Sequence, residues 1–412
     1  MTRRMSERRT SIIGAFLVAL GPVSMALYTP AMPELVRAFS SSEAAIKMTL
    51  SLYFAGFAFA QLVSGTLSDV IGRRRTTLIF MAIYLAGSLM AAFAPSVSVL
   101  LAGRLVQGIG ASVGMTVARA IVRDQFTGLQ AARIMNMIGM MLAIGPAVSP
   151  TLGGLALGLF GWQSIFFLMV GFALMACVSV QFFMAETATP DPAKGHLRPI
   201  LAAYRELLTD SRFVSSTLVI AGAVGALYAQ ATMLPFVLIG TVGLTPTEFG
   251  VGMLMQSGFF FSGTVTVRLL MRRFTPQALV PVGLCFIALG SVALAYTMHA
   301  LEPSFLSVMA PVGVYAFGIA FVMPYMMTAA MAPFPHIAGT ASAMMGFIQM
   351  GAGLLGGALA AIVGVPVLAL GTIIPSFGLL CVLSYLWYRR TVRLTPLAAP
   401  TDGKRALPEA AE

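Results

Sequence analysis

The segment 65–75, Gly-Thr-Leu-Ser-Asp-Val-Ile-Gly-Arg-Arg-Arg, places one carboxylate beside a run of guanidinium groups, between two apolar runs. Asp69 should lie at the C-terminal end of a helix, where the helix dipole disfavours a negative charge and a compensating partner is needed. Arg73, Arg74 or the N-terminus of a neighbouring helix can supply it, and Gly65 and Gly72 permit close approach and a tight turn. We expect these residues to form a polar latch; the alternative is a solvated basic loop that only sets the topology.

Arg104 is the one basic residue that falls well inside an apolar run. It lies roughly 10 Å into the run that begins at Val97, at 1.5 Å per residue. A buried arginine costs about 3 kcal/mol or more in a membrane, so its guanidinium should face a water-filled cavity or a partner. Gln107 and Gly108 should share that face. The alternative is that the side chain snorkels to the outer interface.

The run 133–156 combines helix-bending prolines with small residues. Two prolines four residues apart remove backbone donors and bend a helix, and small residues let neighbouring helices approach closely. We expect a kinked helix that can pivot against a partner; the alternative is a static packing seam. A matching small-residue row is expected at Gly258, Ser262 and Thr266. The residues expected to form the hinge are Gly145, Pro146, Pro150, Gly153 and Gly154.

Few acids are placed to carry a proton. None of the 14 Asp and Glu residues lies deep in an apolar run, whereas a proton carrier must be titratable and exposed alternately to both sides of a membrane. Glu34 and Glu43 fall near the outer ends of their runs, and Asp69 lies near an inner end. These three are imperfect candidates for proton transfer, or else coupling is absent.

Polar and aromatic side chains at mid-run suit the binding of amphipathic ligands. Each of them alone can equally be a helix-packing contact. The residues expected to bind substrate are Tyr28, Gln107, Asn136, Tyr228, Phe236 and Gln256.

The residues discussed above lie in or between long apolar runs, and these runs indicate the fold class. The 412 residues are 58% hydrophobic and 9% charged, whereas soluble domains are about 45–50% apolar and about 25% charged. Each membrane span takes about 20 apolar residues. We therefore predict an all-α integral membrane protein with twelve transmembrane helices. The expected spans are residues 11–33, 43–64, 76–94, 97–118, 133–156, 162–184, 213–239, 249–270, 278–298, 304–330, 339–363 and 366–388.

The net charge of +11 comes from basic residues that gather on one side of the membrane, and they do not form the kind of patch that binds nucleic acid. Six segments that fall on one side hold 22 of the 25 Lys and Arg residues, and the opposite side holds only Arg37 and Lys47. Basic loops stay in the cytoplasm, so both termini are expected there. We expect no nucleic-acid partner.

The longest internal polar segment divides the spans six and six. The expected units are an N-terminal six-helix bundle (1–184), a cytoplasmic linker (185–212), a C-terminal six-helix bundle (213–388) and a cytoplasmic tail (389–412). The two bundles should be pseudo-symmetric repeats, although the second lacks an acid equivalent to Asp69. Within the linker, residues 204–208 can form a short helix on the membrane surface or remain a plain linker.

The sequence lacks the residues that several other classes of protein require. No GxxxxGK[ST] phosphate loop supports an ATP-driven pump, and no histidine cluster suggests a metal. The three cysteines have no paired spacing. An enzyme would need a nucleophile and base at mid-span, and the sequence offers no such pair. We expect neither enzymatic activity, nor a cofactor, nor a metal site.

The segment 65–75, the stretch Arg104–Gly110 and the stretch Gly145–Gly154 resemble signatures of the major facilitator superfamily, and within it of the twelve-span drug:proton antiporters. The stretches 28–33, Tyr-Thr-Pro-Ala-Met-Pro, and 162–167, Trp-Gln-Ser-Ile-Phe-Phe, look closest to the bicyclomycin and chloramphenicol resistance (Bcr/CflA) branch. The resemblance covers all twelve spans, and its diagnostic residues are concentrated in the first six.

The resemblance implies a bacterial inner-membrane transporter in which two bundles rock about a central cavity while inward proton flow drives drug outward. It implies that Asp69, Arg73 and Arg74 latch the cytoplasmic side and that Arg104 takes part in proton coupling, with Glu34 or Asp69 as the acid. Residues 145–154 would form the moving seam. The expected partners are protons, the lipid bilayer and small amphipathic drugs such as bicyclomycin or amphenicols, and we expect a monomer.

One position departs from the family pattern. Many relatives have an aspartate two residues before the tyrosine of the first span, where this chain has Ala26. The missing carboxylate keeps open a metabolite importer or uniporter of the same fold without proton coupling. A nontransporting sensor or scaffold is disfavoured, because it would not require Arg104 or the kinked helix. Since Arg104 is the sole deep charge, neutral or anionic compounds are favoured over strongly cationic ones.

Overall fold

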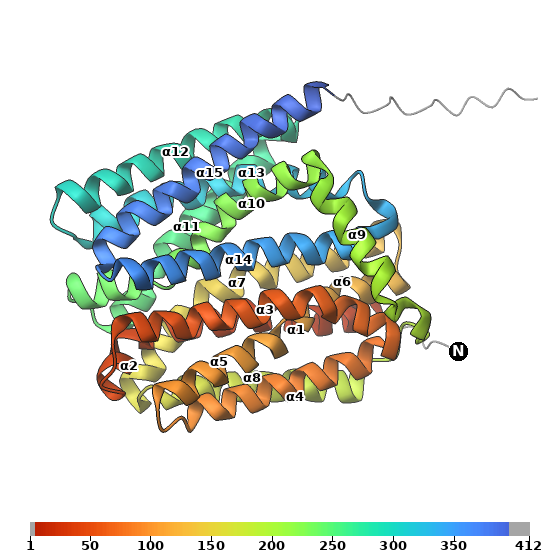
Figure 1. The fold of residues 1–412 in the computed structure, drawn as a ribbon, viewed down its shortest axis with the longest axis horizontal. Helices are drawn as coiled ribbons and strands as arrows, with labels where there is room; N and C mark the ends of the chain where they lie inside the picture. Colours follow the sequence, from red (N-terminus) through yellow and green to blue (C-terminus); the bar gives the residue numbers. More distant parts are fainter. Residues whose placement is uncertain (1–4, 395–412) are drawn as a thin grey trace, which may run out of the picture.

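The computed structural model describes residues 5–394, and all regular elements in this range are helices. Long helices lie side by side, with α1–α8 forming one half of the molecule and α10–α15 the other (Figure 1). The elements of the first half are α1 (Glu7–Tyr28), η1 (Thr29–Ala31), α2 (Met32–Ala38), α3 (Glu43–Ile71), α4 (Arg73–Ala92), α5 (Val97–Ala111), α6 (Val113–Gln125), α7 (Gly128–Phe160) and α8 (Gln163–Phe183). Those that follow are η2 (Pro192–Gly195), α9 (Leu197–Thr209), α10 (Ser211–Gln230), η3 (Phe236–Thr241), α11 (Pro246–Leu270), α12 (Pro276–Ala300), α13 (Phe305–Met331), η4 (Pro335–Ile337), α14 (Ala338–Val363) and α15 (Pro366–Leu394).

The prediction of twelve spanning helices in two bundles is confirmed. Eleven helical segments of the described range are long and apolar enough to cross a membrane, and α11, with 25 residues, occupies the place of the remaining predicted span. The span predicted at 97–118 is divided at Ser112 into α5 and α6, and that predicted at 213–239 is completed by the π-helical segment η3. Each half buries its own apolar core, because its long helices carry apolar residues that pack against one another.

Two pairs of helices join the halves: α3 packs against α14, and α7 packs against α11. We name the ends of the molecule after the short helices that lie there, the α2 end and the α9 end (Figure 1). Toward the α2 end, a Cβ added to Gly357 would lie 2.2 Å from Ser51 Oγ. Toward the α9 end, a Cβ added to Gly346 would lie 2.4 Å from Gln61 Nε2, and Arg119 donates a hydrogen bond to Ser342 across the interface. The halves are therefore in contact toward both ends.

The structure corrects the bounds of the predicted spans 43–64 and 76–94, which left residues 65–75 as a loop between them. Helix α3 continues through Ile71 and α4 begins at Arg73, so Gly72 alone separates them. Gly72 has φ 99°, a left-handed conformation that favours glycine. Gly65 lies within α3, and a Cβ there would meet nothing within 4 Å, so it provides no close approach. A polar stretch was predicted to be a loop because helix ends in polar sequence carry no apolar period.

The segment between the halves forms the amphipathic helix α9, longer than the stretch 204–208 that the sequence suggested. Tyr204 donates a hydrogen bond of 2.7 Å to the carbonyl of Leu62, so α9 is tied to α3. Burial raises the pKa of Tyr204 to about 12, so the hydroxyl is protonated and able to donate at neutral pH. His336 and Glu206 form a second contact of 3.1 Å, from the segment before α14 to α9.

Candidate functional site

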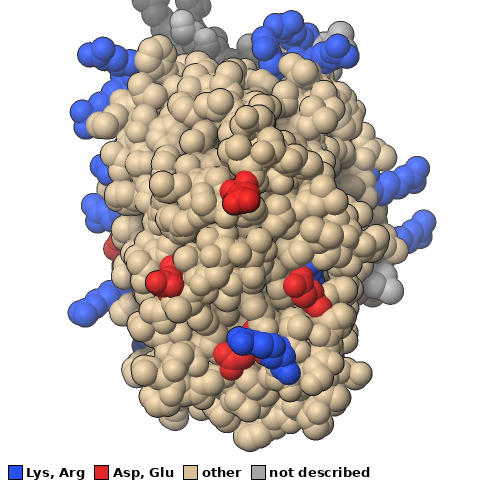
Figure 2. Space-filling view, turned by 90° about the vertical axis from the view of Figure 1, so that its left-hand side faces the viewer, with Lys and Arg blue, Asp and Glu red and all other residues tan. Residues whose placement is uncertain are grey.

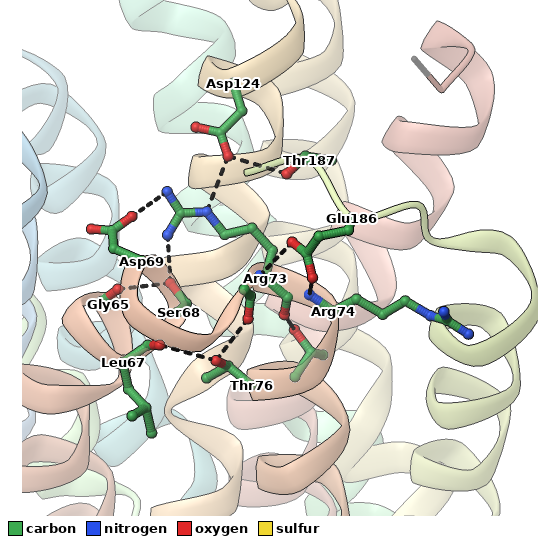
Figure 3. A network of polar contacts seen from close by, with 12 residues as sticks. Gly65, Leu67, Ser68, Asp69, Arg73, Arg74, Thr76, Asp124, Glu186 and Thr187 are labelled. Atoms are coloured by element: carbon green, nitrogen blue, oxygen red, sulfur yellow. Dashed lines mark hydrogen bonds and ion pairs between the residues drawn. The ribbon is translucent and has the colours of Figure 1, made fainter. Parts of the chain in front are cut away.

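Arg73 is the centre of a polar network at the α9 end (Figure 3). Its side chain is 4% exposed. It pairs with Asp69 of α3, and its Nε donates to Asp124 Oδ2 of α6 at 3.0 Å. Nη1 donates to Ser68 Oγ at 2.6 Å, so each of the three guanidinium nitrogens has a partner. The network therefore fastens α3, α4 and α6 together.

Glu186, after the end of α8, closes the N-terminus of α4. Its carboxylate accepts from the backbone N–H of Arg73 at 2.6 Å and from that of Arg74 at 3.2 Å (Figure 3). Free N–H groups and the positive end of the dipole make a helix N-terminus a favourable place for a carboxylate. The next residue, Thr187, donates to Asp124 at 3.1 Å. The start of the linker to the second half is therefore built into the network.

The predicted latch residues thus meet, with two differences in their partners. Asp69 pairs with Arg73, and no described contact joins its carboxylate to the N-terminus of a neighbouring helix. Arg74 donates from its side chain to the carbonyl of Gln181 in α8 rather than to Asp69. A cavity of about 580 Å³ opens beside the network. Its lining is Asp69, Arg73, Arg123, Asp124 and residues 187–191.

Replacing Glu186 by glutamine should lower the thermal stability of the protein in detergent. The amide keeps one acceptor but loses the charge and one of two backbone contacts, a loss of about 1 kcal/mol for a helix cap. Glu302→Gln, at an exposed acid far from the network, is the matched control. Equal melting temperatures for the two variants would show that Glu186 does not stabilise α4.

Arg104 is the centre of a second polar cluster, inside the first half. Its side chain is 0% exposed. The guanidinium carbon lies 4.3 Å from the ring centroid of Tyr28 and 4.4 Å from that of Tyr53, so the group has aromatic rings as neighbours from α1 and α3. One nitrogen, Nη1, donates to Gln107 Oε1. Gln107 Nε2 in turn donates to Ser88 Oγ at 2.8 Å, which orients the amide oxygen toward the arginine.

The structure places Arg104 against aromatic partners rather than at a water-filled cavity or the outer interface. Nε and Nη2 have no hydrogen-bond partner, and no ion pair of Arg104 occurs in the range 5–394. Tyrosine faces attract a cation by their quadrupoles, and this attraction is stronger where water is excluded. The positive charge is therefore only partly compensated. A single residue's position in an apolar run indicated burial, but not the distant rings that surround it.

The glycines of α7 contact two different helices. A Cβ on Gly145 would lie 2.9 Å from Val23, and one on Gly153 would lie 2.4 Å from the carbonyl oxygen of Leu27, both of α1. A Cβ on Gly154 would lie 2.3 Å from the carbonyl oxygen of Pro246 at the start of α11. Helix α7 runs unbroken through Pro146 and Pro150. It thus lies between its own half and the other half, at backbone contact with each.

The small-residue row predicted in α11 does not face α7. A Cβ on Gly258 would meet nothing within 4 Å, and Ser262 is exposed. The contact instead uses Gly250, where a Cβ would lie 2.5 Å from the carbonyl oxygen of Pro150. Thr151 also donates to the carbonyl of Gly250 at 2.9 Å. The four-residue spacing identified small residues but not which face of the helix meets the partner.

The residues predicted to bind substrate are dispersed. Tyr28 and Gln107 belong to the Arg104 cluster. Tyr228 lies at the interface of the halves, its ring 5.7 Å from that of Phe54. Gln256 is buried in α11 with its Oε1 unpartnered, and Asn136 is exposed on α7. The structure therefore brings two of these six residues together.

Phe236 contacts Lys47, which the sequence had placed at the outer surface. Lys47 is 0% exposed, and its ammonium lies 4.9 Å from the ring centroid of Phe236, in the other half. It pairs at 3.1 Å with Glu43, whose side chain is 43% exposed. Glu43 and Asp69 lie 26 residues apart on α3, about 39 Å along the axis at 1.5 Å per residue. Glu34, in α2, shares the end of Glu43. The residues proposed for proton coupling, Glu34, Asp69 and Arg104, are thus not one cluster.

Residues 12–357 match the family model described as Major Facilitator Superfamily, which is most of the chain. The chain belongs to the major facilitator superfamily. It is 27% identical to multidrug resistance protein D of Escherichia coli (strain K12) over 90% of this chain and 93% of that protein. It is 29% identical to multidrug resistance protein MdtL of Citrobacter koseri over 84% of this chain and 87% of that protein. The crystal structure of a D-xylose-proton symporter is similar in fold, with a TM-score of 0.70, 15% identity and coverage of 92% and 96%.

As a major facilitator, the protein is a multi-pass membrane transporter and not an enzyme. Sequence reasoning missed several residues of its two clusters: Ser68, Asp124, Glu186 and Thr187 beside Arg73, and Tyr53 and Ser88 in the Arg104 cluster. One signal was available for Asp124, an acid directly after Arg123 at the end of an apolar run, where a carboxylate at the negative end of the helix dipole needs a cation.

Proposed function

We propose that this transporter exports small amphipathic drugs, such as bicyclomycin or amphenicols, by proton antiport through alternating access. The similarity to two proteins named multidrug resistance proteins supports drug export. We place the chain in the bicyclomycin and chloramphenicol resistance branch on the stretches 28–33 and 162–167. We also propose that the transporter acts as a monomer.

The observation that carries alternating access is the pair of seams between the halves. At both seams, α3–α14 and α7–α11, the helices approach each other closely at glycines. These are Gly346 and Gly357 in α14, and Gly154 and Gly250 at the α7–α11 contact. Contacts through small residues leave few interlocked side chains to break when helices separate. A rocking motion about these seams would open one end while the other remains closed.

We propose that the α9 end faces the cytoplasm of a bacterial cell and that both termini lie inside. The α2 end has a largely uncharged surface with a few separated acids and little basic charge (Figure 2). The basic residues are concentrated in the segments assigned to the opposite side. This asymmetry is what the positive-inside rule requires for insertion into the inner membrane. The Arg73 network then latches the cytoplasmic side, and α7 is the hinge.

Proton coupling would involve Arg104 together with Glu34 or Asp69 as the titratable acid. A specific observation favours a second candidate, an importer or uniporter of the same fold. Position 26 is alanine, and none of the described carboxylates pairs with Arg104. A transporter without a carboxylate at its deep charge has no evident group to take a proton from one side to the other.

Everted membrane vesicles that contain the transporter should take up an amphenicol when a proton gradient is imposed, and drug addition should dissipate the gradient. Export from the cell becomes uptake in this orientation, because the cytoplasmic side faces outward. Vesicles without the protein are the control. Drug flux that is independent of the gradient, without proton movement, would instead support the uniporter.

A further inference from the structure

The free hydrogen-bond donors of Arg104 lie together on one edge of the guanidinium. Nη1 is used by Gln107, and the centroids of the Tyr28 and Tyr53 rings lie 4.3 and 4.4 Å from the guanidinium carbon. The unpartnered atoms are Nε and Nη2. Their N–H bonds point the same way from the planar group, the arrangement that binds a carboxylate through two parallel hydrogen bonds.

A buried guanidinium normally has an acid as its counter-charge. The described acids lie elsewhere: Glu34 in α2, Glu43 beside Lys47, and Asp69 and Asp124 beside Arg73. The hydrogen bonds of Gln107 and the rings of Tyr28 and Tyr53 orient the arginine without neutralising it. The site is therefore positive and pre-organised, and its missing component is an oxyanion.

The cluster lies close to the interface that opens in alternating access. Tyr53 precedes Phe54, whose ring packs against Tyr228 of the other half and beside Gly353 of α14. Tyr53 itself is held by a hydrogen bond of 3.0 Å to the carbonyl of Gly21. When α3 separates from α14, an apolar ring of a ligand can fill the aromatic region around Phe54 and Tyr228 while its charged group reaches Arg104.

We propose that Arg104 binds the anionic group of a substrate, and that the transporter binds amphipathic organic anions bearing a carboxylate or sulfonate more tightly than uncharged drugs such as the amphenicols. The assignment rests on the proposed function and specifies its substrate class. Cationic amphiphiles are excluded, because a second positive charge near an uncompensated guanidinium in a low-dielectric site is repelled. Neutral analogues bind weakly, since they leave Nε and Nη2 without a charged acceptor.

Three probes that share one fluorophore test the assignment on the purified full-length protein. Dansylglycine is an anion, dansylamide is neutral, and dansyl ethylenediamine is a cation. Binding is followed by fluorescence anisotropy. Dansylglycine should bind about tenfold or more tightly than dansylamide, the gain expected for charge-assisted hydrogen bonds, and the cation should bind most weakly. Equal or weaker binding of dansylglycine compared with dansylamide overturns the proposal without the use of any variant.

Variants of the protein then test whether Arg104 is the residue that causes the preference for the anionic probe. Arg104→Gln should weaken dansylglycine binding about tenfold and leave dansylamide within about twofold, whereas Arg104→Lys, which keeps the charge but loses the planar fork, should lie between. Arg37→Gln removes an exposed positive charge outside the cluster and is the control. A preference for dansylglycine that survives Arg104→Gln also overturns the assignment.

Flux of the same probes into everted vesicles separates this inference from the proposed function. Gradient-driven uptake of dansylamide or the cation, but not of dansylglycine, contradicts the substrate class and leaves export standing. Anion-selective binding that depends on Arg104, without gradient-driven flux of any probe, contradicts export by proton antiport and leaves the binding assignment standing.

Discussion

Replacing Arg73 by glutamine should reduce drug transport by about tenfold or more while leaving substrate binding within about twofold. The guanidinium is buried and joins Asp69, Asp124 and Ser68. Breaking a buried pair by removing one partner costs about 3–5 kcal/mol, because the remaining charges stay unpaired. Such a change is large enough to move a two-state conformational equilibrium about a hundredfold. The network lies within the first half, but it fastens α3 and α6, which both contact α14 of the other half. The α9 end should then fail to remain closed.

Two measurements separate a broken latch from a misfolded protein. Transport is measured in everted vesicles, and opening is measured as the labelling rate of a cysteine placed at Ser342, the residue of α14 that Arg119 contacts. Arg75→Gln removes the same charge two residues away from an exposed position and is the matched control. Arg73→Gln should speed the labelling, and Arg75→Gln should not. Identical transport and labelling in the two variants would remove Arg73 from the mechanism.

The same network predicts how the losses of transport caused by changes at Asp69 and at Arg73 combine. Asp69→Asn alone should slow transport and retain binding. In the double variant with Arg73→Gln, the loss should be smaller than the sum of the two single losses, because residues in direct contact are coupled. Full additivity would mean that the two residues act separately, and the latch would not depend on their ion pair.

The sequence predicted the helices better than their contacts, for a physical reason. An apolar run of about 20 residues forms a helix in a membrane, because each backbone polar group must find its hydrogen-bond partner within the same segment. The partners of Arg73 obey no such local rule: Asp124 lies 51 residues away and Glu186 lies 113 residues away. Lys47 illustrates the same limit, since its burial depends on Phe236 in the other half.

Replacing Gly154 by alanine should reduce transport about tenfold or more, although it adds only one methyl group. The new Cβ would lie 2.3 Å from the carbonyl oxygen of Pro246 and 3.1 Å from the Cα of Thr247, and neither backbone atom can move like a flexible side chain. Alanine favours a helix by about 1 kcal/mol over glycine, so local propensity predicts no damage. The damage should come from the seam: α7 and α11 can no longer approach at the α2 end.

The conformational consequence distinguishes this variant from a general loss of stability. The α2 end should stay open, so a cysteine placed at Thr247 should react faster with a membrane-impermeant maleimide added on the side of the membrane that the α2 end faces. Gly158→Ala, one helical turn further along α7, is the matched control, because its Cβ would meet only the Thr247 hydroxyl at 3.8 Å. It should transport and label like the parent. If Gly154→Ala behaves like Gly158→Ala, close approach at this seam is not needed for transport, and α7 is a static support rather than a hinge.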